Sequence, residues 1–262
     1  MTDKTIELRV NDGVAYATLN RPQAANALDL TMARDLFEVA IRCDAQPDVR
    51  AVVLTGAGRA FSAGGDVKSF AAAGERLPAV LKEITALLHG AVSILARMDA
   101  PVIAAVNGVA AGAGMSLACA ADIVLAAESA RFTVAYTRLG LSPDGSSTFY
   151  LAQLVGLRRA QELILTNRML TASEAFAWNL VNRVVPDSAL LAEAAKLARE
   201  LAAGPSRAFG RVKRLLLAAF AAGLETQMAL ETEQITDAAR GADALEGIAA
   251  FVAKRPPRFV GA

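Results

Sequence analysis

The stretch PVIAAVNGVAAGAGMSLACAADIVLA, residues 101–126, decides the fold. Its first part, Pro101 to Val106, is a short apolar run that predicts a strand buried on both faces. A glycine-rich turn follows, and Gly112 to Ala120 predicts a tightly packed helix. Ile123 to Leu125 then begins another buried strand. A strand, a helix and a strand in this order indicate a right-handed crossover in a mainly parallel sheet.

The same region also allows a membrane-spanning alternative. Ala100 to Ala121 carries no charged side chain and is long enough to cross a bilayer. It consists mostly of alanine, glycine and short β-branched residues, with Pro101 at its start and Asn107 inside. Such a glycine-rich run is a weak membrane candidate. We therefore expect it to be buried in a protein core, and we expect no membrane partner.

The segments before this stretch continue the alternation of strands and helices. The expected elements are a hairpin from Ile6 to Leu19 with its turn at Asn11-Asp12-Gly13, a helix from Leu30 to Asp44, a strand from Ala51 to Leu54, and a helix from about Pro78 to Arg97. After about Gly145, helical spacing dominates. Apart from a short strand at Arg183 to Val185, helices are expected at about 157–166, 172–179, 187–203, 205–221, 223–239 and 242–253.

The change to mainly helical spacing divides the chain into a core, residues 1–200, and a C-terminal helical region, residues 201–262. Packing or subunit contact is the expected role of that region.

Apolar residues make up 54% of the 262 residues, which is enough for a large core. The 27 basic and 26 acidic residues give a net charge of +1, so nucleic acid is not an expected partner. Cys43 and Cys119 lack metal or redox spacing, and the N-terminus lacks an apolar signal segment. We expect a cytoplasmic protein without a metal site.

Two glycine-rich turns each follow a buried strand: TGAGRAFSAGGDVKSF, 55–70, and VNGVAAGAGMSLACAAD, 106–122. Glycine and alanine let a backbone come close to a ligand and leave its N–H groups free. A helix that starts after such a turn adds unpaired N–H groups and the positive end of its dipole. Two converging turns would supply two donors to a developing oxyanion, each worth about 3–4 kcal/mol in a transition state.

The sequence also allows two types of site other than a pair of oxyanion donors. A dinucleotide fingerprint starts in both turns, but Phe61 and Leu117 stand where its third glycine is required. Ser116 lies near a nucleophile-elbow pattern, and a serine hydrolase would need His89, the chain's only histidine, as its base. A packed serine and a half-buried histidine are the simpler interpretations.

A lone carboxylate lies in FTVAYTRLGLSPDGSSTF, residues 132–149. Asp144 is the only charged residue between Arg138 and Arg158. Pro-Asp-Gly is a strong turn sequence, so a turn is one interpretation, and a catalytic base is the other. We expect Leu141, Pro143 and Phe149 to surround this carboxylate.

Several of these stretches together resemble the crotonase (enoyl-CoA hydratase/isomerase) superfamily. They are LNRPQAANAL at 19–28, AFSAGGDVKSF at 60–70, residues 101–126, LTNRMLTASEAFAWNLVNRVV at 165–185 and AFVAKRPPRF at 250–259. The resemblance implies an α/β fold, a spiral of ββα units that binds an acyl-CoA thioester. It also implies that the C-terminal helices form trimers or hexamers of two trimers. Coenzyme A is then part of the substrate, and no permanently bound cofactor is implied.

The resemblance also implies roles for residues at matching positions. The oxyanion donors would be the N–H groups of Gly65 and Ala113. The implied coenzyme A contacts are the backbone around Ala63, Asp66 and Val67 with Lys68 nearby on the adenine side, residues 24–28 from Ala24 onward along the pantetheine, and Phe251 and Lys254 toward a neighbouring subunit's coenzyme A. A solvated basic tail is an equally open interpretation of Lys254.

The departures from the family pattern direct the functional prediction. Family hydratases place two glutamates over the substrate double bond, and here the matching positions are Ser116 and Tyr136. Neither can act as a carboxylate base near neutral pH. Asp144 falls where several family isomerases carry a single catalytic carboxylate. The resemblance therefore favours an enoyl-CoA isomerase that moves a proton from C2 to C4, with Tyr136 and His89 shaping the acyl pocket or holding the carboxylate.

Three alternatives stay open at this point. Aryl-CoA dehalogenases of the superfamily use an aspartate at the position of Asp144 as a nucleophile, His89 matches their histidine, and Tyr136 falls where they carry a tryptophan. A hydratase-like activity is the second alternative. A catalytically silent acyl-CoA-binding protein that kept the pocket is the third.

Overall fold

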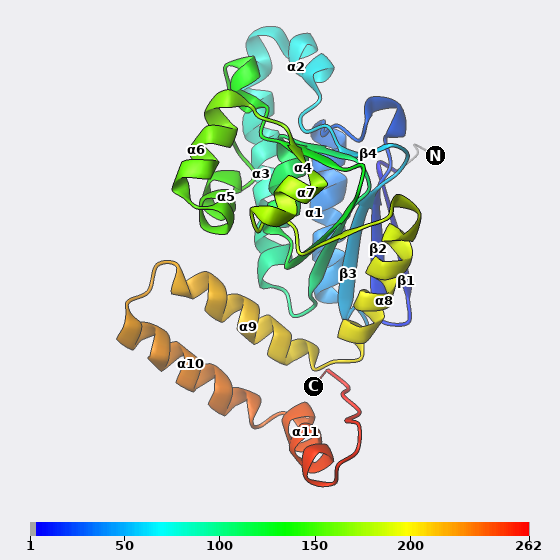
Figure 1. The fold of residues 1–262 in the computed structure, drawn as a ribbon, viewed down its shortest axis with the longest axis vertical. Helices are drawn as coiled ribbons and strands as arrows, with labels where there is room; N and C mark the ends of the chain where they lie inside the picture. The colour runs from blue at the N-terminus through cyan, green and yellow to red at the C-terminus, as the bar shows by residue number, and fades with distance from the viewer. Residues whose placement is uncertain (1–3, 262) are drawn as a thin grey trace.

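A computed structural model describes residues 4–261 and shows two sheets (Figure 1). The large sheet has the strand order β1 (Ile6–Asn11), β2 (Val14–Leu19), β3 (Ala51–Gly56), β5 (Val102–Val106), β7 (Ile123–Ala127), β10 (Arg183–Val185). The small sheet has the order β4 (Ala60–Ser62), β6 (Val109–Ala111), β8 (Arg131–Thr133), β9 (Leu170–Thr171). Both sheets are mainly parallel, since the antiparallel pairs in the described chain are β1 with β2 and β8 with β9.

A repeating unit of two strands and a helix connects the sheets. In the pairs β3–β4, β5–β6 and β7–β8, the first strand joins the large sheet and the second joins the small one. The helices that follow these pairs are α2 (Val67–Ala73) with α3 (Leu77–Arg97), α4 (Ala113–Ala120) and α5 (Ser147–Val155). The predicted spiral of ββα units is therefore confirmed.

Helices cover the large sheet and close the core. α1 (Leu30–Ala45) begins at Asp29, whose carboxylate accepts the N–H of Met32, and α1 packs against α3. α8 (Leu190–Ala202) packs across β2, β3, β5 and β7. Leu36, Leu88 and Ile103 are fully buried between these layers. The central strands β3 and β5 are buried along their whole length, as their continuous apolar runs predict.

The uncharged run at 100–121 forms β5, β6 and α4 in the core, as expected. The segment Val67–Arg97 is apolar and long enough to cross a membrane by length and composition alone. It comprises α2, one short turn of 3-10 helix and α3. The α3 part buries a stripe of side chains in the core: Ile84, Leu88, Ala91, Val92, Leu95 and Ala96.

The last three helices extend from the core as an arm, which we define as residues 206–252 (Figure 1). They are α9 (Ser206–Ala219), α10 (Leu224–Ala238) and α11 (Ala242–Val252). α9 contacts α3 and α10. The arm leaves large apolar side chains exposed, among them Leu216, Leu224, Ile235, Ile248 and Phe251. The division of the chain into residues 1–200 and 201–262 stays a prediction.

The structure also contains elements that the sequence did not predict. The strands of the small sheet are two or three residues long, which is too short for a period-2 pattern to be recognised. α5 begins directly after the Pro-Asp-Gly turn, where turn residues hide its start. The remaining helices, α6 (Leu157–Thr166) and α7 (Ala172–Ala177), were predicted, and α7 begins with a capping box between Thr171 and Glu174.

Candidate active site

The two glycine-rich turns meet in space. Gly64 has φ +90°, and a Cβ at this position would lie 2.8 Å from the carbonyl oxygen of Ala111 and 3.2 Å from Cα of Gly112. Gly112 itself has φ +49° and directly precedes α4. A side chain at Gly64 would push the turns apart, so glycine is needed for this close approach.

The turn at Gly65 is fixed on both sides while its own N–H stays free. Leu28 donates its N–H to the carbonyl oxygen of Gly64 at 2.6 Å, and its own carbonyl accepts the N–H of Asp66 at 2.8 Å. Between residues 4 and 261, the N–H of Gly65 has no hydrogen-bond acceptor, and neither does that of Ala113, the first residue of α4. Two backbone donors without acceptors thus lie on neighbouring turns, and their role as oxyanion donors stays a prediction.

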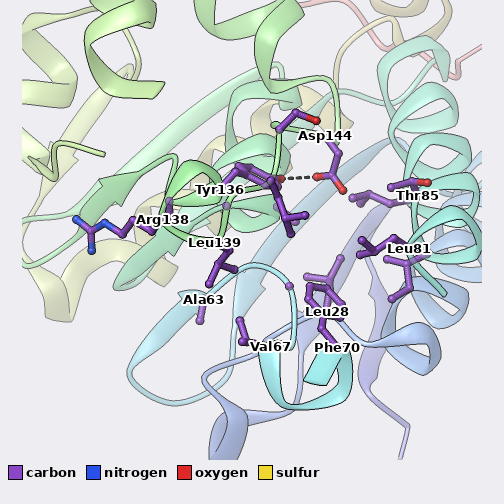
Figure 2. A pocket seen from close by; sticks show the side chains of 18 of the residues that line it. Leu28, Ala63, Val67, Phe70, Leu81, Thr85, Tyr136, Arg138, Leu139 and Asp144 are labelled. Carbon is purple, nitrogen blue, oxygen red and sulfur yellow. Dashed lines mark hydrogen bonds between the residues drawn. The ribbon is translucent and has the colours of Figure 1, made fainter. Parts of the chain in front are cut away.

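Both donors line one cavity of about 560 Å³ (Figure 2). Its wall is largely apolar, with Leu28 and Phe70 on one side and Leu81, Ile84 and Leu88 of α3 on another. Asp144 also lines it, and among the described lining residues this is the only carboxylate. The cavity therefore combines two amide donors, one acid and an apolar surface.

Asp144 is held by hydroxyl and amide groups. The Tyr136 hydroxyl donates to Oδ1 of Asp144, as the dashed line in Figure 2 marks. The Ser116 hydroxyl donates to the Asp144 carbonyl oxygen at 3.0 Å, and the N–H of Ser147 donates to the same oxygen at 3.1 Å. Burial raises the pKa of Tyr136, and the neighbouring Asp144 carboxylate raises it further. Tyr136 therefore stays protonated and remains a donor at neutral pH.

The residue after Asp144 is anchored from outside the cavity. Gly145 has φ +59°, and a Cβ there would lie 2.9 Å from Cβ of Ser116, so only glycine fits without movement. Its N–H donates to Nε2 of His89 at 3.1 Å. A histidine that accepts at Nε2 is neutral and carries its proton on Nδ1.

The expected apolar cover of Asp144 is only partly present. Leu141 lines the cavity, but Asp144 is half-buried and Phe149 is 43% exposed. The Phe149 ring packs edge-on against Phe220 of the arm instead, with ring centroids 5.5 Å apart. The prediction that Phe149 surrounds the carboxylate was therefore wrong, because the helical turn of α5 directs this side chain outward.

The structure brings some of the predicted site residues together and leaves others apart. Gly65, Ala113, Ala63, Val67, Tyr136 and Asp144 line the cavity. Ala24, Asp66 and Lys68 lie close in sequence to residues that line the cavity, but they are not among its described lining residues. His89 lines a separate cavity of about 320 Å³, together with Phe149 and Tyr150. A direct role of His89 in shaping the acyl pocket is thus corrected to an anchor for Gly145. Phe251 lies in the last turn of α11 and Lys254 lies two residues beyond its end, and their predicted contact with a neighbouring copy's coenzyme A stays a prediction.

The alternative sites find no support in the described residues. Ser116 is fully buried, and its hydroxyl bonds to Gly112, Tyr136 and Asp144 rather than to a histidine. Phe61 and Leu117, which stand where a dinucleotide fingerprint requires its third glycine, are buried core side chains. Within residues 4–261, no group of three or more His, Cys, Asp or Glu side chains could hold a metal ion.

Sequence reasoning missed one charged residue near the Gly65 turn. Arg21 forms ion pairs with both Asp29 and Asp66. Its position in LNRPQAANAL was visible, but no local pattern marks its pairing with Asp29, and only the fold brings it to Asp66, 45 residues further along the chain.

Comparisons with known proteins agree with this geometry. The family described as enoyl-CoA hydratase/isomerase matches residues 9–262. A probable enoyl-CoA hydratase of Rhodobacter capsulatus is 42% identical over the full length of both chains, and the 1,2-epoxyphenylacetyl-CoA isomerase of Escherichia coli is 40% identical over 96% of this chain and 97% of its own. A 4-chlorobenzoyl coenzyme A dehalogenase of Arthrobacter is 36% identical over 81% of this chain and 77% of its own.

A solved structure shares the whole fold. The enoyl-CoA hydratase of Polaromonas sp. JS666 superposes with a TM-score of 0.92 at 34% identity and covers 97% of this chain and 99% of its own. The two sheets, the converging turns and the C-terminal helices are thus arranged as in a known acyl-CoA enzyme fold. The chain belongs to the enoyl-CoA hydratase/isomerase family.

Proposed function

We propose that this enzyme is an acyl-CoA isomerase that shifts a double bond through a thioester dienolate, with Asp144 as its single proton carrier. One observation supports this proposal above the others. Asp144 is the only carboxylate among the described residues of a cavity that also contains the free N–H groups of Gly65 and Ala113.

The reaction needs one acid–base group. In a 3-enoyl thioester the C2 proton is both allylic and next to the thioester carbonyl. Asp144 accepts this proton, and the electron pair spreads over the thioester oxygen and C4. The amides of Gly65 and Ala113 donate to that oxygen and stabilise its negative charge. Asp144 then returns the proton to C4, so that the double bond moves from C3–C4 to C2–C3 and no atom is lost.

The cavity lacks the groups that hydration requires. Addition of water needs a base that activates the water molecule, and the two positions that carry glutamates in family hydratases hold Ser116 and Tyr136. Both hydroxyls are already bonded around Asp144. Tyr136 has a raised pKa, so it does not act as a base near neutral pH. These side chains favour proton transfer over hydration.

The similarity to 1,2-epoxyphenylacetyl-CoA isomerase suggests a second candidate substrate class. A ring-bearing acetyl thioester also has an acidic proton on the carbon next to the thioester carbonyl. Removal of that proton by Asp144 and stabilisation of the oxyanion would start its rearrangement in the same way. We therefore include arylacetyl-type thioesters among the substrates to be tested.

A dehalogenase function is less well supported. Attack by Asp144 on an aromatic ring creates an ester that a further base must help to hydrolyse. His89 matches the position of such a base, but its Nε2 is occupied by the N–H of Gly145 and its side chain faces a different cavity. This arrangement favours a general-base role for Asp144.

The first experiment replaces the proposed base. Asp144→Asn keeps the size of the side chain and removes its ability to accept a proton. We expect the conversion of 3-hexenoyl-CoA to its conjugated isomer, measured by ultraviolet absorbance, to fall by about 10²–10⁴-fold. Binding of the coenzyme A ester, measured by calorimetry, should change little because the amide donors stay in place.

The matched control is Asp12→Asn, which makes the same chemical change at the exposed hairpin turn. This variant should isomerise at the wild-type rate. Unchanged turnover in Asp144→Asn would remove Asp144 from the mechanism. Tight binding of enoyl and arylacetyl thioesters by the wild type without any turnover would support a silent acyl-CoA-binding protein, and rapid hydration of crotonyl-CoA would support a hydratase.

A further inference from the structure

A cluster of three poorly exposed charged side chains lies beside the Gly65 turn. Nη2 of Arg21 lies 3.0 Å from Oδ2 of Asp29 and 2.9 Å from Oδ2 of Asp66. The side chains of Arg21, Asp29 and Asp66 are 17%, 23% and 13% exposed. Removing one member of a poorly solvated ion pair leaves an uncompensated charge, so this cluster is sensitive to substitution.

Arg21 connects the two segments that bracket Gly65. One partner, Asp66, directly follows Gly65 and caps α2 by accepting the N–H groups of Lys68 and Ser69. On the other side, Nη1 of Arg21 donates to the carbonyl of Ala27, the residue before Leu28. Leu28 in turn bonds to the residues on both sides of Gly65. The orientation of the free Gly65 N–H thus depends on two segments that one guanidinium joins.

The backbone of Arg21 holds the same loop. Its N–H donates to Oδ1 of Asn26 at 2.9 Å, and its carbonyl accepts the N–H groups of Ala24 and Asn26. Asn26 is fully buried, and its carbonyl accepts the hydroxyl of Ser62. The Ser62 oxygen then accepts the N–H of Gly64. A second chain of hydrogen bonds therefore runs from Arg21 to the residue before Gly65.

Charge gives Arg21 another effect at this place. Burial raises the pKa of Asp66, but N–H groups of Ser69 and Lys68 and the Arg21 guanidinium outweigh it and leave that pKa below its ordinary value. Asp66 is therefore ionised at neutral pH, next to the residue whose amide must attract an oxyanion. Without Arg21, the negative charge beside Gly65 would oppose the charge that develops on the thioester oxygen.

We infer that Arg21 is a positioning residue for the oxyanion hole: it orients the Gly65 N–H through Asp66 and Ala27 and offsets the carboxylate beside it. This inference rests on the proposed function only in so far as a thioester oxygen binds to Gly65 and Ala113. It does not depend on which reaction Asp144 performs.

The test measures polarisation of a bound thioester without turnover. The probe is 4-(dimethylamino)cinnamoyl-CoA, a conjugated thioester whose absorption moves to longer wavelength when its carbonyl oxygen accepts strong hydrogen bonds. We expect Arg21→Met to lose more than half of the wild-type red shift. Its kcat for 3-hexenoyl-CoA should fall by about 10–100-fold, somewhat less than for removal of a whole oxyanion donor. KM should stay within about threefold, because the apolar wall is untouched.

Three further variants separate positioning from general stability. Arg21→Lys keeps the charge but loses the forked geometry, so its red shift should be intermediate. Asp66→Asn loses the partner next to Gly65 and should reduce the red shift. Asp29→Asn loses the partner on α1 but keeps the contact to Asp66, and its red shift should match the wild type. If Arg21→Met does not fold, Arg21→Lys and the two aspartate variants carry the test.

The outcomes distinguish this inference from the proposed function. A wild-type red shift in Arg21→Met, or equal losses in Asp29→Asn and Asp66→Asn, would overturn the positioning role. Asp144→Asn should keep the full red shift while losing turnover. A wild type that polarises the probe but does not isomerise any thioester would sink the proposed reaction and leave the role of Arg21 intact.

Discussion

Tyr136 is the side chain that most directly controls Asp144. Its hydroxyl donates to one carboxylate oxygen and leaves the other free in the cavity (Figure 2). Its raised pKa keeps this donor protonated over the working range of pH. Tyr136 therefore fixes the direction of the Asp144 carboxylate.

This contact can be tested by substitution. Tyr136→Phe keeps the ring and removes the donor to the Asp144 carboxylate. A hydrogen bond to a charged group contributes about 1.5–3 kcal/mol, so kcat/KM for 3-hexenoyl-CoA should fall by about 10–100-fold. The reason is that the carboxylate loses the contact that fixes its direction.

Tyr16→Phe, which makes the same change on β2, should keep the wild-type kcat/KM. An unchanged kcat/KM in Tyr136→Phe would show that the hydroxyl does not influence proton transfer by Asp144. The wild type and both variants are measured with 3-hexenoyl-CoA at the same pH.

Individual residues show where sequence reasoning succeeded and where it stopped. The two glycine-rich turns and the isolated Pro-Asp-Gly could be recognised because they have local signatures, whereas the choice of Gly65 and Ala113 within those turns came from the family resemblance, and the catalytic roles stay predictions. Arg21 could not be recognised, since its partners Asp29 and Asp66 come from separate segments. The burial of Asp144 was also misjudged, because sequence neighbours of a turn residue need not be its neighbours in space.

At the scale of elements, the buried Lys213 side chain helps to attach α9 to the core through an ion pair with Asp122. Nζ of Lys213 lies 2.8 Å from Oδ2 of Asp122 and donates to the carbonyls of Leu95 and Ala100 at 2.8 and 3.0 Å. All three of its protons thus have acceptors. Burial lowers the pKa of Lys213, and the Asp122 carboxylate opposes this shift. The contact ties the first helix of the arm to the ends of α3 and β5.

Lys213→Met should therefore weaken the attachment of the arm. The substitution leaves the Asp122 carboxylate and the carbonyls of Leu95 and Ala100 without the ammonium group that they share. We expect this loss to lower the free energy of unfolding, measured with urea, by about 3–5 kcal/mol. The control is Arg214→Met, the next residue, whose exposed pair with Asp99 should contribute less than about 1 kcal/mol. Equal, small effects of the two substitutions would contradict the role of the buried pair.

Helices and strands also differ in how clearly the sequence predicts them. The helix from Leu30 and the buried strands around Val52 and Ile103 were predicted within a few residues, because their apolar periods are long or continuous. The small sheet was not predicted. Its strands are short and gain stability by pairing across segments, so no local pattern marks them.

At the scale of the molecule, the arm presents several large apolar side chains to solvent. Ile248, Phe251 and Val252 of α11 are 64%, 85% and 76% exposed. Exposed apolar patches of this kind mark contact surfaces. We therefore expect copies of the chain to associate through the arm as trimers or pairs of trimers, with Phe251 and Lys254 near a neighbouring site.

Light scattering after size-exclusion chromatography tests this expectation. The wild type should have three or six times the mass of one chain. Ile248→Asp combined with Phe251→Asp places charges on the arm and should reduce the mass, because burial of an unpaired charge is unfavourable. Val10→Asp, at an exposed apolar position of β1, should leave the mass unchanged. A monomeric wild type would refute association.

The proposed oxyanion donors are main-chain groups, whereas the proposed acid and its two hydroxyl partners are side chains at positions 144, 136 and 116. A point mutation can erase or exchange each of those side chains, but no ordinary codon change deletes a peptide N–H short of introducing proline. Proteins that descend from a duplicated gene would therefore keep the two backbone donors to the thioester oxygen. Their chemistry could diverge through a handful of exchanges inside the cavity, which makes this scaffold readily adaptable to new acyl groups.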